Sequence, residues 1–108
     1  MPLFNPEYPG SNQSPGDVIQ RYIIEGLGIG VRQLAHALNV PPNRLYQIIQ
    51  NKRDISVDTA VRLGLYLNMD AEFWLDIQTR YKMNIFKHSV PQINEEVTPL
   101  KHKTGSMV

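Results

Sequence analysis

The sequence contains no cysteine, which excludes disulfide frameworks, thiol catalysis and cysteine-ligated zinc. No apolar run approaches the roughly 18 residues that a membrane-spanning helix needs, and residues 1–10 lack the basic and apolar segments of a signal peptide. Neither a strand-like alternation of apolar and polar residues nor an internal repeat is visible. These absences predict a soluble, cytoplasmic protein that has no membrane partner.

Residue clusters that would indicate an enzyme are absent too. His36, His88 and His102 are widely separated, and none has a second ligand at metal spacing. Glu72 and Asp76 lie one helical turn apart, but a carboxylate pair on an exposed helix is usually solvated. No glycine-rich phosphate loop and no nucleophile elbow occurs. We therefore predict no enzyme activity, no catalytic residue, no cofactor and no metal site.

The length of 108 residues fits one domain with irregular ends. Residues 1–14 are rich in proline, glycine, serine and asparagine, which predicts an irregular N-terminal arm. Residues 15–87 carry the helical periodicity and form the predicted domain. Residues 88–108 show no sustained apolar period, so we expect an extended or disordered C-terminal tail there.

Apolar residues recur at helical spacing in five segments, which predicts an all-α fold. The first segment runs from residue 15 to about 26–28, and the last from 71 to about 83–87. The other three are expected at about 31–38, 42–50 and 57–67. Asn39 accepts the left-handed backbone of a C-terminal cap, and Pro42 suits a first helical turn. Ser56 and Asp70 are the predicted N-caps of the last two helices.

The second and third predicted helices have the spacing of a helix-turn-helix. Ala35 is small enough for the two helices to approach closely, Val40 fills the turn, and Leu45 and Ile48 anchor the third helix. Although the formal net charge is only +1, residues 30–53 include four basic side chains and no acidic one. This local excess of positive charge favours contact with nucleic acid.

The outward face of the third helix bears hydrogen-bond donors and no acid. Gln pairs bidentately with adenine and Arg with guanine, and the major groove admits one such helix. We predict that the bases are read by Asn43, Tyr46, Gln47 and, at the margin, Gln50. Contacts to the DNA backbone are predicted for Gln33, Arg44, Asn51, Lys52 and Arg53. Arg44 could equally contact a neighbouring carboxylate.

A two-fold symmetric operator requires a protein with matching symmetry, so we expect a homodimer on double-stranded DNA. The fifth predicted helix carries a bulky apolar stripe that the other helices need not cover completely. The predicted dimer contact consists of Trp74, Ile77 and Tyr81, although core packing is the simpler explanation for part of Trp74.

Over residues 14–82 the sequence resembles the HigA-like (VapI-like) antitoxins of the Xre and Cro/C1 helix-turn-helix class. The resemblance rests on five stretches, Ser14–Asp17, Leu34–Leu45, Asn51–Ser56, Asp58–Leu63 and Glu72–Tyr81, of which the last is the most specific. Three positions depart from the family pattern: Ser14 replaces the usual His, Asn51 the usual Gly and Asp76 the usual Asn.

The resemblance implies a five-helix, lambda-repressor-like fold and a bacterial antitoxin. Such a protein represses its own operon as a dimer and neutralises a toxin resembling the HigB mRNA interferases. Residues outside the match, 1–13 and those after about 84, are then candidates for toxin contacts. Two alternatives stay open: a stand-alone Xre-type transcriptional regulator without a toxin partner, and a protein-interaction module that has lost DNA binding.

Overall fold

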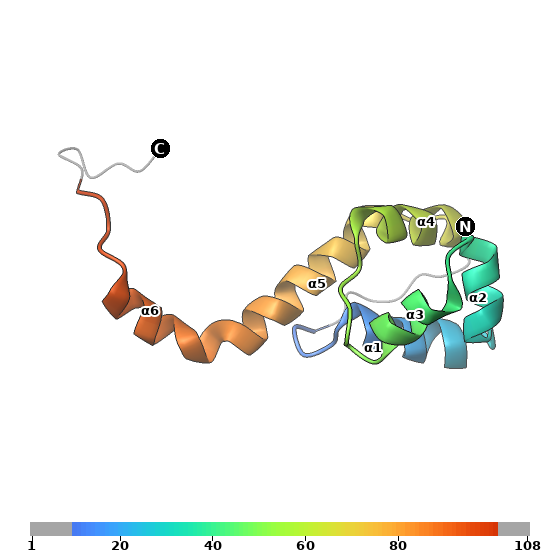
Figure 1. Cartoon of the computed structure of the whole chain (residues 1–108), viewed down its shortest axis with the longest axis horizontal. Helices are drawn as coiled ribbons and strands as arrows, with labels where there is room; N and C mark the ends of the chain where they lie inside the picture. Colours follow the sequence, from blue (N-terminus) through green and yellow to red (C-terminus); the bar gives the residue numbers. More distant parts are fainter. Residues whose placement is uncertain (1–9, 102–108) are drawn as a thin grey trace.

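The computed structural model describes residues 10–101, and within this range every regular element is a helix (Figure 1). The all-α prediction is confirmed. The first predicted helix is the α-helical turn α1 (Pro15–Val18) followed directly by the π-helical segment η1 (Ile19–Glu25). The other four predicted helices are α2 (Val31–Leu38), α3 (Pro42–Ile49), α4 (Val57–Leu67) and α5 (Ala71–Phe86).

The predicted helix ends follow from local backbone chemistry. Asn39 ends α2 in the left-handed conformation at φ 57°, as expected from the side chain. Ser56 caps α4 by accepting a hydrogen bond from the Thr59 amide at 3.2 Å. Asp70 occupies the N-cap position of α5, but its side chain makes no capping hydrogen bond. Asn39 and Ser56 therefore cap their helices in the predicted way, whereas the Asp70 side chain does not.

The core lies between α1, η1, α2, α3, α4 and the first half of α5, which packs against α4 and α1. Each helix contributes to the core the apolar residues of its inward face. Trp74 of α5 is one of them, and its ring packs edge-on against the ring of Phe73, with 5.2 Å between the ring centroids. The largest fully buried side chains are Trp74, Ile19, Ile23, Leu34, Leu45, Ile48, Leu63, Leu67 and Ile77. We call this packed part of the molecule, up to Tyr81, the head.

The chain leaves the head beyond Tyr81, although Lys82 Nζ still lies 2.6 Å from Oδ2 of Asp54. The second half of α5 extends away from the other helices and continues through a 3₁₀ turn (Lys87–Ser89) into α6 (Val90–Glu96) (Figure 1). The Cα radius of gyration is 17.6 Å, against about 13 Å for a compact chain of 100 residues. We call residues 82–97 the arm.

Helix α6 corrects the prediction of an extended or disordered tail over residues 88–108. Pro91 lies in the first turn of α6, where proline is tolerated. The remainder of the predicted tail, residues 102–108 with His102, and positions 1–9 of the predicted N-terminal arm lie outside the described residues. Between residues 10 and 101, no helix is long and apolar enough to cross a membrane, and no group of His, Asp and Glu side chains could hold a metal ion.

Candidate nucleic-acid interface

Helices α2 and α3 pack against each other through the small and apolar residues that the sequence indicated. Ala35 and Leu45 are fully buried, and Ile48 is nearly so. The Val40 amide donates to the Ala35 carbonyl at 3.0 Å, which closes the turn between the helices, and the Val40 side chain is buried beneath it. This arrangement fixes α3 on the head with one face inward and the other free.

The free face of α3 carries the predicted base-reading residues. Asn43, Tyr46 and Gln50 are exposed, while Gln47 is half-buried. Gln47 is not entirely free, because its Oε1 accepts a hydrogen bond from Arg53 Nη1 at 3.3 Å. Bidentate pairing of Gln47 with adenine needs this oxygen as the acceptor of the adenine N6 amine. Arg53 must therefore share or release Gln47 when α3 enters a groove.

The loop between α3 and α4 holds three of the predicted backbone-contacting residues in a defined position. Asn51 adopts a left-handed conformation at φ 62°, and the Lys52 amide donates to the Gln47 carbonyl at 2.8 Å. Further along, Gln78 of α5 binds both backbone groups of Ile55: its Oε1 accepts from the amide at 2.7 Å, and its Nε2 donates to the carbonyl at 3.0 Å. Asn51, Lys52 and Arg53 are all exposed.

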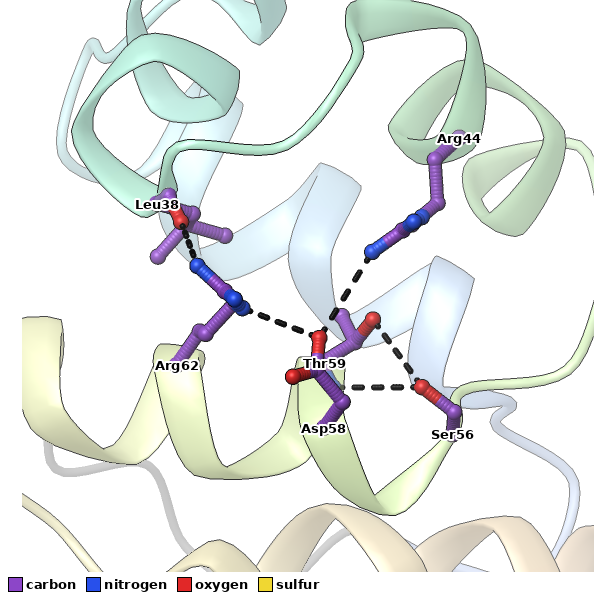
Figure 2. Close-up of polar contacts among 6 residues, drawn as sticks. All are labelled: Leu38, Arg44, Ser56, Asp58, Thr59 and Arg62. Carbon is purple, nitrogen blue, oxygen red and sulfur yellow. Dashed lines mark hydrogen bonds and ion pairs between the residues drawn. The ribbon is translucent and has the colours of Figure 1, made fainter.

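Arg44 points towards α4 rather than straight out of the helix (Figure 2). Its Nη1 lies 3.7 Å from Asp58 Oδ2, so the structure realises the alternative in which this side chain contacts a carboxylate. The same oxygen accepts from Arg62 Nε at 2.9 Å, and Arg62 Nη1 donates to the Leu38 carbonyl at 3.0 Å. Asp58 and Arg62 therefore connect the end of α2, the start of α3 and α4. Gln33, the remaining predicted backbone contact, is exposed near the start of α2.

The prediction for the dimer contact is wrong for two of its three residues. Trp74 and Ile77 are 0% and 1% exposed, because α5 packs this face against α4 and α1. Only Tyr81 is partly exposed, and it lines a cleft of about 450 Å³ between the start of α1, the loop after α3 and α5. Apolar side chains that no helix covers lie on α4 (Val57, Val61 and Leu65) and, further along the chain, in the arm.

Sequence reasoning missed several residues that hold or extend this site. Arg62 and Gln78 act across tertiary contacts, although the i, i+4 spacing of Asp58 and Arg62 was a visible signal. Among the exposed large apolar side chains of the arm, four in its helical segments lie at alternating spacings of three and four residues: Met83, Phe86, Val90 and Ile93. This spacing is typical of a helix seam and could have been found in the sequence.

The packed helix pair and its acid-free outer face define a class, the helix-turn-helix DNA-binding proteins. No protein-family model matches the chain. The chain is 35% identical over 80 residues to virulence-associated protein I of Dichelobacter nodosus, covering 74% of each protein. The solved Pseudomonas aeruginosa antitoxin HigA with higBA promoter is 31% identical, with a TM-score of 0.75 over 83% of this chain and 99% of that one.

A further solved structure, of the antitoxin GraA in complex with its operator, is 27% identical and has a TM-score of 0.76 over 93% of this chain and 99% of that one. The chain therefore belongs to the HigA-like (VapI-like) family within the Xre and Cro/C1 class. These relatives are named as antitoxins and a virulence-associated protein, in agreement with the prediction that the chain is not an enzyme.

Proposed function

We propose that this protein is an antitoxin that binds the operator of its own operon and represses transcription. The observation that carries the proposal is the outward face of α3, which presents Asn43, Tyr46 and Gln50 to solvent with no acid among them. Such a face can donate to base edges in a major groove, while Lys52 and Arg53 contribute sequence-independent attraction to phosphate. Because the operator is DNA in the bacterial cytoplasm, the proposal also places the protein there.

The proposed partner is a toxin resembling the HigB mRNA interferases. Support comes from the relatives, since two similar solved structures are named as antitoxins and one of them contains the higBA promoter. A second candidate function is a stand-alone transcriptional regulator. It is favoured by a 30% identical relative from Haemophilus influenzae that is described only as a helix-turn-helix transcriptional regulator.

One experiment separates the two candidates. The chain is expressed alone and together with the product of the neighbouring reading frame, and each preparation is titrated with the DNA upstream of its own gene. An antitoxin binds that DNA and also co-purifies with its neighbour in a stable complex. A stand-alone regulator binds the DNA but retains no neighbour. Absence of preference for the upstream duplex over a scrambled one would contradict both candidates.

The protein should bind its operator as a homodimer, and the arm offers the contact surface. Met83 and Phe86 of α5 and Val90 and Ile93 of α6 are between 36% and 61% exposed, and their spacing of three, four and three residues resembles a heptad that the 3₁₀ turn interrupts. An isolated copy leaves these side chains in water, at a cost of about 25 cal/mol for each Å² of apolar surface. A second copy presents the same spacing, which satisfies the self-complementarity of a two-fold interface.

A further inference from the structure

Ser14 and Asn51, two of the residues that depart from the family pattern, are hydrogen-bonded to each other in the structure. The hydroxyl of Ser14 donates a hydrogen bond to Oδ1 of Asn51 at 2.6 Å, although 37 positions separate them in the sequence. Ser14 is 2% exposed at the start of α1, whereas Asn51 is exposed in the loop after α3. The contact therefore joins a buried anchor to a residue at the proposed DNA surface.

The hydrogen-bonding capacity of Ser14 determines how the amide of Asn51 is oriented. Ser14 Oγ already accepts from the Asp17 amide at 3.0 Å, which leaves the single hydroxyl proton to be donated elsewhere. Asn51 Oδ1 accepts that proton, so the amide oxygen is the inward atom. Among residues 10–101, Asn51 Nδ2 has no hydrogen-bond partner, and its two N–H groups are available as donors.

The backbone around this contact is rigid enough to maintain the orientation. A side chain on Gly16 would place its Cβ 2.1 Å from the Ile48 carbonyl oxygen, so the first turn of α1 lies directly on the end of α3. The backbone N–H of Asn51 donates to the same Ile48 carbonyl oxygen at 3.0 Å. Asp17 completes the cap of α1 by accepting from the Ser14 amide at 3.1 Å. Neither end of the Ser14–Asn51 contact can move alone.

We propose that Ser14 is a positioning residue for DNA binding: its hydroxyl holds the Asn51 amide so that Nδ2 donates to a backbone phosphate beside α3. The inference rests on the proposed function, because it requires this loop to face DNA. Phosphate contacts carry no sequence information, so losing the orientation weakens binding to every duplex equally. Asn51 is uncharged and releases no counterion, so the salt dependence of binding stays unchanged.

The test is a double-mutant cycle on Ser14→Ala and Asn51→Gly, titrated with the upstream duplex and with a scrambled one. Gly keeps the left-handed backbone at residue 51, and each single variant should weaken binding to both duplexes by about fivefold. The double variant should bind no more weakly than either single variant. Ser56→Ala is the matched control, because it removes an N-cap of the same kind from α4 without touching Asn51.

Asn51→Asp adds a second discriminating measurement. A carboxylate still accepts from the Ser14 hydroxyl, so the thermal midpoint should be retained, but it repels phosphate and should bind DNA more weakly than Asn51→Gly. Equal affinities for Ser14→Ala and Ser56→Ala, or additive losses in the cycle, would overturn the inference and leave the proposed function standing. A wild-type chain that binds no duplex would overturn both.

Discussion

The outer face of α3 in the head and the arm place opposite kinds of side chain in water. In the head, apolar residues such as Trp74 and Leu45 are fully buried, and the exposed face of α3 is polar. In the arm, Met83 and Phe86 are 61% and 50% exposed, and no residue of α6 is buried. A polar face suits nucleic acid and an apolar surface suits another protein, so under the proposed function the two regions fit two different partners.

The same helix serves both regions. The first half of α5 contributes Trp74 and Ile77 to the core, and its second half carries the exposed apolar residues. An apolar stripe on a helix therefore does not reveal by itself whether it faces its own domain or another molecule. The difference depends on how far the neighbouring helices reach, which is a property of the tertiary structure.

The largest expected effect comes from truncating the core of the head. Trp74→Ala should lower the free energy of unfolding by about 3 to 5 kcal/mol, because it leaves a cavity beneath α4. Urea denaturation followed by circular dichroism measures the loss. Tyr46→Ala truncates an aromatic side chain that is 41% exposed, and should cost far less. A stable Trp74→Ala variant that has merely become monomeric would restore the original dimer prediction.

A charge in the arm should act on association instead of folding. Phe86→Asp should raise the dimer dissociation constant more than about 100-fold, since an unpaired buried charge costs about 3 to 5 kcal/mol. Sedimentation over a concentration series measures it. Ile85→Asp is the matched control, because Ile85 is 57% exposed, against 50% for Phe86, but lies outside the spacing of the four proposed contact residues. If both variants dimerise like the wild type, the arm is not the dimer contact.

Base reading by α3 should separate from stability. Gln47→Ala should remove about 1 to 3 kcal/mol of discrimination between the operator and a scrambled duplex, because a bidentate base contact is lost. Its thermal midpoint should change little, since Gln47 is only half-buried and its side-chain hydrogen bond to Arg53 lies at the surface. Binding to the two duplexes, together with a melting curve, provides the measurement. An unchanged specificity ratio would transfer the assignment to Asn43 and Tyr46.

The smallest expected effect concerns phosphate contacts. Lys52→Ala should weaken binding to all sequences and reduce the slope of log affinity against log salt by about 0.9, the value for one released counterion. Lys101→Ala removes the same charge from an exposed position outside the head and should leave the slope unchanged. A Lys52→Ala variant that changed sequence preference at constant slope would show that Lys52 reads bases.

Much of the head could be predicted because its helix ends are determined locally. Asn39 and Ser56 act through their own backbone and side-chain chemistry, so α2 ends and α4 begins where these residues indicated. The outward face of α3 followed from its helical period, since Leu45 and Ile48 had to face inward.

The remainder depends on contacts between distant residues. The hydrogen bond from Arg62 to the Leu38 carbonyl spans 24 positions, and no local pattern specifies it. Trp74 and Tyr81 share one stripe, yet only the first lies under α4. Helix α6 was not predicted because proline both ends helices and opens them, so Pro91 alone does not show which of the two it does.

The two hydrogen bonds between the Gln78 side chain and the Ile55 backbone should slow hydrogen exchange in the loop after α3. A side-chain amide here satisfies both backbone groups of a loop residue, at 2.7 and 3.0 Å, as a neighbouring strand would do in a sheet. Backbone amide protons in loops usually exchange through small local openings. The Ile55 amide proton, however, can exchange only when α5, which carries Gln78, separates from the loop. In deuterated water, the Ile55 amide should therefore exchange at the slow rate of the buried helices, while the Arg53 amide two residues earlier is replaced quickly.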